Sequence, residues 1–395
     1  MRTASSRPGA FSWLSMPRAV VLLSAAALLG LLWYALAPGL AGTSDSRFYL
    51  AAAASWAGSG RLLNPDGTPY TSWGPLYPVL LAPGVEQERA WTTALQLLST
   101  LLCWAGWSWL AWQLLPQRYL ATGLVAALAV AAPWLVTAKF VWSEPVFQAL
   151  FAGYASCLYA YLRNRRFSWW AAATVLGLLL PLQRMSGLFL LLGVGLGLLV
   201  YYGYEWRAHW RRWLIHALVI GLGNGAWLLY AKRAAATPEL YRSRGWQGLR
   251  ETLGDYGYVL TRWLVPVQQA GWPKHWLFEL ILPVLLLSLG YAVWRSRAPF
   301  VRLLGTVVLC YLLCHIGTTV MSRAGGNVYD VERYAAVVYG AFLLVLAEAA
   351  ASLQPRRPWL RWVLALWLLY PVARAGRVAH FCHQMQVLSW PTPRP

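Results

Sequence analysis

Residues 43–84, TSDSRFYLAAAASWAGSGRLLNPDGTPYTSWGPLYPVLLAPG, are the most informative stretch of this sequence. They follow a long apolar run over residues 19–41. Residues 46–57 carry helix formers with one apolar face, and Ser44 or Asp45 is well placed to cap that helix. Turn residues with Tyr and Trp come next, followed by the apolar LYPVLLAPG. The pattern predicts amphipathic helices joined by an aromatic loop and lying on a membrane face.

The composition of the whole chain indicates a membrane protein. Of its 395 residues, 59% are apolar and 12% are charged, whereas an ordinary soluble domain has about 25% charged residues. So few charges cannot cover a water-facing surface, which excludes a soluble globular enzyme. A disordered chain is also excluded, since disorder requires low hydrophobicity. We therefore predict an all-α polytopic membrane protein.

Apolar stretches of about 20 residues are long enough to cross a bilayer. The sequence predicts about 11 such helices, within a range of about 10–12. They lie near residues 19–41, 91–115, 119–138, 145–162, 168–183, 185–204, 213–231, 276–294, 300–321, 334–353 and 359–372. We expect one transmembrane domain over 1–372, with long outer loops at 42–90 and 232–275, and a short tail over 373–395.

The basic residues predict the orientation of these spans. The chain has 33 Lys+Arg against 13 Asp+Glu, a formal net charge of +20. Such an excess can indicate a nucleic-acid partner, but here many arginines cluster in short connectors such as RNRRF (163–167) and RAHWRR (207–212). Cytoplasmic connectors carry this excess. We therefore predict a multi-pass protein of the inner or plasma membrane, with a cytoplasmic N-terminus and no nucleic-acid partner. The first apolar run is too long for a cleaved signal peptide.

Charged residues also stand at span ends that this orientation places outside the cytoplasm. Asp45 follows the first span, Glu144 lies in VWSEPVF, Arg184 lies in LQRMSGL, and Arg333 lies in NVYDVERYAAV. Ionisable groups at membrane depth are costly and are usually functional. The alternative is that each one caps a helix or forms a structural pair. Their common side predicts a functional site on the extracytoplasmic face.

These motifs together resemble the GT-C superfamily of integral membrane glycosyltransferases. The similar members are the dolichyl-phosphate-mannose–protein mannosyltransferases and the bacterial lipid A aminoarabinose transferases. The first outer loop carries most of the resemblance, and SEPVF, LQRMSGLFLLL and ERYAAVVYG follow in the same order, so it covers about residues 15–350. It implies a polyprenyl-phosphate-linked sugar donor, a lipid, glycan or protein acceptor, and Asp45 as the general base.

Transfer of a sugar from a lipid phosphate requires a base for the acceptor and cations for the leaving phosphate. Many members have a second acidic residue directly after the catalytic Asp, but here Ser46 stands in that position. We therefore expect Glu144 to supply the second carboxylate. No cofactor is certain; a divalent cation is left open, although the missing acidic neighbour weakens the case for a metal.

Further candidates come from the arginines and aromatic residues on the outer side. Arginine binds phosphate with two parallel hydrogen bonds and stays charged. The candidate phosphate ligands are Arg184, Arg333, Arg47 and Arg323. The candidate sugar or acceptor contacts are Tyr49, Tyr70, Trp73 and Tyr77, although an aromatic belt at the membrane interface would explain the same residues. Asp66 lies in NPDGTPY, where turn chemistry favours a structural role.

Two other interpretations compete with the glycosyltransferase. A transporter or flippase for a lipid-linked saccharide would show internal repeats and paired interrupted helices, and no such repeat is visible. A noncatalytic membrane scaffold would not explain acids gathered at outer span ends. The five cysteines indicate no disulfide framework, and Cys310, Cys314 and His315 favour helix packing over a metal site.

Overall fold

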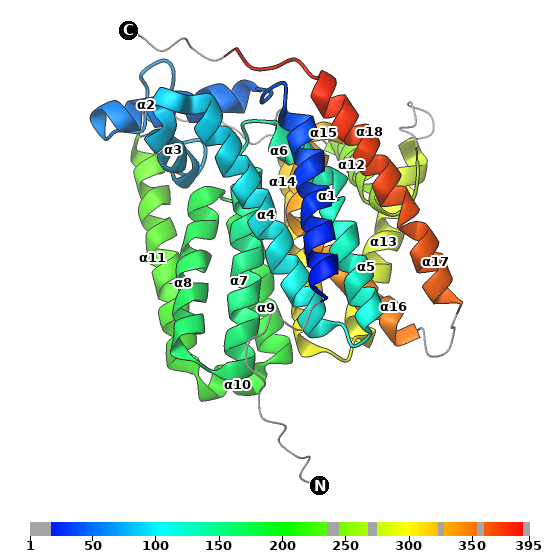
Figure 1. Cartoon of the computed structure of the whole chain (residues 1–395). Coiled ribbons are helices and arrows are strands. Elements are labelled where there is room, and N and C mark those ends of the chain that lie inside the picture. The colour runs from blue at the N-terminus through cyan, green and yellow to red at the C-terminus, as the bar shows by residue number, and fades with distance from the viewer. Residues whose placement is uncertain (1–16, 235–244, 268–274, 323–327, 354–358, 390–395) are drawn as a thin grey trace.

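The computed structural model describes residues 17–234, 245–267, 275–322, 328–353 and 359–389. Within these ranges the chain is a bundle of helices with no strand (Figure 1). The helices are α1 (Arg18–Leu36), α2 (Ser44–Ser59), α3 (Leu76–Leu81), η2 (Ala82–Gln87), α4 (Glu88–Leu114), α5 (Arg118–Ala129), α6 (Ala132–Lys139), α7 (Glu144–Asn164), α8 (Phe167–Gln183), α9 (Gly187–Tyr201), α10 (Gly203–Ala208), α11 (Trp210–Ala234), α12 (Gly245–Leu264), α13 (His275–Arg295), α14 (Pro299–Met321), α15 (Val328–Ala335), η3 (Ala336–Val338), α16 (Tyr339–Leu353), α17 (Leu360–Trp367) and α18 (Leu369–Gln384).

The described helices confirm a polytopic all-α membrane protein. Among them, 7 are long and apolar enough to cross a membrane, judged by length and composition. These are Arg18–Leu36, Leu76–Leu114, Arg118–Lys139, Trp210–Ala234, Trp276–Arg295, Pro299–Met321 and Val328–Leu353. The shorter α8 and α9 are also apolar. The count of about 11 spans therefore stays a prediction.

The amphipathic helices predicted after the first span are α2 and α3, which lie across one end of the bundle (top of Figure 1). The cap differs from the expected Ser44 or Asp45. Thr43 is the N-cap residue of α2, and its backbone N–H donates to Ser46 Oγ at 3.0 Å. Because Asp45 does not cap the helix, its carboxylate is available for another partner.

Two segments expected to lie outside the bundle are packed helices. Within the predicted loop 232–275, the described helix α12 packs against α13, α14 and α15 and buries Tyr256 and Trp263. The predicted tail 373–395 begins inside α18, which packs along α1 and α6. The boundary at residue 372 therefore does not coincide with an end of the helical bundle.

The C-terminal segment also covers the chain that leads into α2. Beyond α18, the N–H of Leu388 donates to the Leu40 carbonyl at 2.8 Å. Its side chain lies so close to Gly42 that a Cβ there would approach it to 2.5 Å. Underneath, the buried Lys139 Nζ donates to the carbonyls of Ala35 and Gly39 at 3.0 and 2.7 Å, which binds α6 to the end of α1.

Candidate active site

Four charged side chains from distant parts of the sequence meet at the end of the bundle that carries α2. Arg333 on α15 donates from Nη2 to Asp45 Oδ2 at 2.6 Å and from Nε to Glu144 Oε1. Arg184, which follows α8, donates from Nη1 to the same Glu144 Oε1 at 2.6 Å. We call Asp45, Glu144, Arg184 and Arg333 the ion-pair cluster. Each member is one of the residues selected from the sequence.

Glu144 is the centre of the ion-pair cluster. Its side chain is fully buried at the first turn of α7, and both arginines donate to its Oε1. Its Oε2 is buried without a hydrogen-bond partner among the described residues. A carboxylate held in this way has no access to an acceptor. The catalytic role expected for Glu144 stays a prediction, and the geometry also suits a residue that positions the two arginines.

Asp45 is the more accessible carboxylate. Its side chain is 19% exposed, compared with 0% for Glu144. Among the described residues, only its Oδ2 has a hydrogen-bond partner, which is Arg333. The other oxygen can therefore accept a proton or a hydrogen bond from a bound molecule.

Aromatic rings and hydroxyls fix the two guanidinium groups. The Arg333 guanidinium lies 4.5 Å from the centre of the Trp142 ring, and Arg184 donates to Ser143 Oγ at 2.9 Å. The Tyr334 ring lies beside both, at 5.4 Å from Arg333 and 5.6 Å from Arg184. Burial alone would lower the pKa of Arg184, but Glu144 together with Tyr49 and Tyr334 outweighs this effect, and the pKa is raised. Both groups are thus fixed cations suited to an anion.

The tyrosines selected from the sequence form a buried support for the site. Tyr49 and Tyr77 pack edge to face at 5.0 Å, and Tyr49 shares a hydrogen bond of 3.3 Å with Ser143. Burial raises the pKa of Tyr49 far above its ordinary value, so the phenol stays neutral. Tyr70 is also fully buried. These three rings are buried, and Trp73 lines a cavity; the sugar or acceptor contacts of all four aromatic candidates stay a prediction.

Gln96 is a supporting residue that sequence reasoning missed. Its buried amide donates to Tyr77 Oη at 3.1 Å and to the carbonyls of Phe140 and Trp142 at 2.8 and 3.0 Å. It holds the segment from Phe140 to Trp142, which precedes Glu144, against α4. A lone glutamine in an apolar run was the only available signal, and helical periodicity does not identify its partners.

Arg47, Arg323 and Asp66 are the remaining charged candidates. Arg47 is exposed on α2 and makes no contact with the cluster as described. Arg323 lies outside the described residues. Asp66 accepts hydrogen bonds from the backbone N–H and hydroxyl of Thr68 at 3.0 and 2.6 Å, which lowers its pKa. The turn role expected for Asp66 is therefore confirmed.

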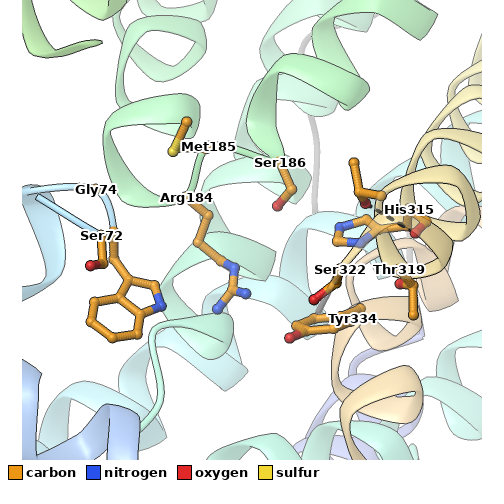
Figure 2. Close-up of a pocket in the computed structure, with 11 residues that line it drawn as sticks. Ser72, Gly74, Arg184, Met185, Ser186, His315, Thr319, Ser322 and Tyr334 are labelled. Carbon is orange, nitrogen blue, oxygen red and sulfur yellow. Dashed lines mark hydrogen bonds between the residues drawn. The ribbon is translucent and has the colours of Figure 1, made fainter. Parts of the chain in front are cut away.

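Two cavities flank the ion-pair cluster. The first, which we call the His315 pocket, has a volume of about 230 Å³ (Figure 2). It is lined by Ser72, Trp73, Gly74, Arg184, Met185, Ser186, His315, Thr318, Thr319, Ser322 and Tyr334. The second, which we call the α18 cavity, has a volume of about 560 Å³. It is lined by Thr43, Val136, Phe140, Trp142, Arg262, Tyr329, Asp330, Glu332, Arg374, Arg377, Val378, Phe381, Cys382 and Met385.

Consecutive residues of α15 connect these features. Glu332 lines the α18 cavity, Arg333 belongs to the ion-pair cluster, and Tyr334 lines the His315 pocket. Glu332 is itself paired with Arg374 of α18 at 2.6 Å and with Arg262 of α12. The motif ERYAAVVYG was selected from the sequence, but these two arginine partners were not, because periodicity does not show which helices meet.

The side chains that could act as metal ligands do not form a metal site among the described residues. Among the described residues, no group of three or more His, Cys, Asp or Glu side chains could hold a metal ion. Asp45 and Glu144 both face Arg333 instead, and a divalent cation between them would meet that positive charge.

The described helices have a fold similar to that of known solved structures. One similar structure is ArnT from Cupriavidus metallidurans bound to undecaprenyl phosphate, with a TM-score of 0.59 and 16% identity over 92% of this chain and 76% of ArnT. The apo state of that ArnT gives a TM-score of 0.56 and 16% identity over 88% and 62%. The arabinosyltransferase EmbB from Mycobacterium smegmatis gives 0.47 and 15% over 97% and 42%.

Sequence comparison adds nothing to this fold-level result. No known family model matches the chain, and no curated protein sequence matches it. The resemblance inferred from the first outer loop is thus confirmed in the fold, at an identity too low to carry function by itself.

Proposed function

We propose that this protein is a glycosyltransferase that moves a sugar from a polyprenyl-phosphate-linked donor to an acceptor on the extracytoplasmic face. One observation carries the proposal: an accessible carboxylate and two fixed guanidinium groups meet between two cavities at the loop-helix end of the bundle. The fold shared with ArnT, which was solved with undecaprenyl phosphate, supports the same class of donor.

In the proposed reaction, Asp45 takes the proton of the acceptor hydroxyl as its oxygen attacks the anomeric carbon of the donor sugar. The bond between that carbon and the phosphate oxygen breaks, and the polyprenyl phosphate leaves with the bonding electrons. Arg184 and Arg333 stabilise the charge that grows on the leaving phosphate. Glu144 holds both arginines in place and takes no proton.

The two cavities support a reaction with two substrates. The His315 pocket begins at Arg184, so we assign the donor sugar to it. The α18 cavity combines apolar walls with Arg377, Asp330 and the ion pairs of Glu332 with Arg262 and Arg374, which suits an acceptor that carries both an apolar part and polar groups. Thr43, two residues before Asp45, lines this second cavity, so an acceptor there would approach the proposed base.

The decisive experiment replaces the proposed base. Purified full-length protein in lipid vesicles is supplied with radiolabelled polyprenyl-phosphate sugars and a membrane lipid extract, and transferred label is counted. Asp45→Asn should lower the turnover rate by about 10²–10⁴-fold, because a positioned general base contributes this much. Its melting temperature should stay close to that of the unchanged protein, since asparagine can keep one hydrogen bond to Arg333.

Asp66→Asn is the matched control, because Asp66 lies in the same loop but is exposed and takes part in a turn. It should leave the transfer rate unchanged. Equal rates for Asp45→Asn and the unchanged protein would remove Asp45 from the reaction. Absence of transfer from every donor, with folded protein, would overturn the proposed function.

A further inference from the structure

The His315 pocket contains a polar group that the proposed chemistry does not use. The His315 side chain belongs to α14 and is only 7% exposed. Its Nε2 is buried and has no hydrogen-bond partner among the described residues. A buried polar atom without a partner is costly and is rare in folded proteins. The unpaired Nε2 therefore indicates that His315 binds a ligand and does not serve helix packing alone.

The orientation of this ring is fixed by aromatic neighbours. Tyr334 stacks on it at 5.0 Å between ring centres, with 18° between the planes. Tyr311 lies at 4.7 Å, and Phe189 packs edge to face at 5.3 Å. With three rings around it, the imidazole cannot turn away to find another partner. Figure 2 shows the ring between Ser186, Ser322 and Tyr334 at the edge of the pocket.

The pocket extends from the ion-pair cluster toward His315. Arg184 lines it and also donates to Glu144, and Tyr334 lies beside Arg184 and against the His315 ring. A donor phosphate held by Arg184 would therefore place its sugar in the direction of His315. The volume of about 230 Å³ is below the range of about 300–1,000 Å³ typical of drug-sized ligands, so it suits one sugar ring.

The side chains that line the His315 pocket carry one positive charge and no negative charge. Hydroxyls come from Ser72, Ser186, Thr318, Thr319 and Ser322, flat rings come from Trp73 and Tyr334, and the charge comes from Arg184. None of the described residues that line the pocket is acidic. Hydroxyl groups of a sugar can exchange hydrogen bonds with this lining, whereas an ammonium group would meet the charge of Arg184 without a lining carboxylate.

We propose that the His315 pocket selects a donor sugar with neutral hydroxyl substituents, that His315 Nε2 forms a hydrogen bond with one of those hydroxyls, and that sugars carrying a protonated amine are rejected. This inference rests on the proposed function, because it takes the pocket as the site of the donor sugar. It assigns His315 a role in specificity, separate from the base and the phosphate ligands.

The test measures donor binding, which requires no acceptor. Full-length protein in lipid nanodiscs is titrated with short-chain polyprenyl phosphates carrying glucose, mannose, galactose or arabinose. Each sugar is compared with two analogues, in which one hydroxyl is replaced by an amine or by hydrogen. We expect the tightest ligand to be a neutral sugar, and its amine analogue to bind at least about tenfold more weakly.

Variants of His315 connect this selectivity with the imidazole. His315→Phe should weaken binding of the preferred sugar by about tenfold and leave unchanged the binding of its analogue without the contacted hydroxyl. His315→Gln, which keeps a hydrogen-bonding side chain, should retain most of the affinity. His216→Gln is the control, because His216 is a buried histidine of α11 whose ring nitrogens already contact Tyr154 and Thr174 at 3.2 and 2.8 Å.

The outcomes separate the two proposals. An amine analogue that binds as tightly as its parent sugar would overturn the inference, as would a His315→Phe variant that weakens all analogues equally. Selective binding without any Asp45-dependent transfer would overturn the proposed function and leave the sugar pocket in place. Transfer that shows no preference between neutral and amine donors would overturn the proposed sugar selectivity and leave the proposed function in place.

Discussion

At the scale of single residues, Glu144 explains how two arginines can lie side by side at the end of a membrane protein. Its one carboxylate accepts hydrogen bonds from both Arg184 and Arg333 on Oε1. Without this negative charge, two guanidinium groups would be held close together, with Asp45 at 2.6 Å and Asp330 at 3.8 Å from Arg333 as the remaining counter-charges. The stability of the site therefore depends on a carboxylate that takes no part in the proposed reaction.

Replacing Glu144 by Gln should thus destabilise the protein. Removing one partner from a buried charge network typically costs about 3–5 kcal/mol, because the other charges stay buried and uncompensated. We expect a clear fall in the melting temperature in detergent, together with loss of transfer. Glu86→Gln is the control, since Glu86 is exposed at the same end of the bundle, and it should change stability by less than about 0.5 kcal/mol. Equal melting temperatures for the two variants would contradict the anchoring role of Glu144.

At the scale of elements, the break between α8 and α9 gives Arg184 its position. Arg184 has an extended backbone (φ −150°, ψ 135°) and ends α8, and Gly187 begins α9. A Cβ on Gly187 would lie 2.6 Å from the backbone of Leu180 and Pro181. Only glycine allows the chain to turn back this closely. The turn directs Arg184 toward α7 and α15 instead of into the lipid.

Gly187→Ala should therefore disrupt the site from a distance. The added methyl group requires α8 and α9 to separate, which should lower both the melting temperature and the donor affinity. Gly195→Ala is the matched control on the same helix, because nothing lies within 4 Å of its Cβ position. It should be neutral or stabilise the protein by up to about 1 kcal/mol, the helix preference of alanine over glycine. If Gly187→Ala binds donor like the control, the tight turn does not position Arg184.

The sequence predicted the elements of this site better than their arrangement. Asp45, Glu144, Arg184 and Arg333 could be found because each is a charge that interrupts or ends an apolar run. The roles within the group could not be predicted, since burial decides between Asp45 and Glu144 and depends on contacts across the bundle. His315 was assigned to packing for the same reason: its free Nε2 becomes evident only when its neighbours are known.

At the scale of the whole molecule, the last helix is part of the candidate active site. Arg374 on α18 donates to Glu332 at 2.6 Å and to the Arg262 carbonyl at 2.9 Å. Glu332 is the residue before Arg333, so α18 and α12 hold α15 at the residue next to the ion-pair cluster. Sequence periodicity does not show this contact, because residues 373–384 of α18 fall within the predicted tail 373–395.

Arg374→Leu should loosen this arrangement. Glu332 would keep only Arg262 as a partner, so we expect faster hydrogen exchange in α15 and α18 and a lower transfer rate. Arg377→Leu, one turn further along α18 and exposed, controls for loss of charge on the same helix. It should not change exchange in α15. Unchanged exchange in Arg374→Leu would show that α18 does not support Arg333.

The contact between Leu388 and the segment before α2 has a consequence for the timing of biogenesis. Leu388 binds Leu40 and covers Gly42, a few residues before Asp45. The proposed base is made before the rest of the bundle, whereas the segment that packs over its loop is made only after α18. The nascent chain can therefore insert its first helices without a finished candidate site, and the proposed site is assembled only after α18 and Leu388 have been made. Premature release after α16 would leave a membrane-inserted but inactive protein.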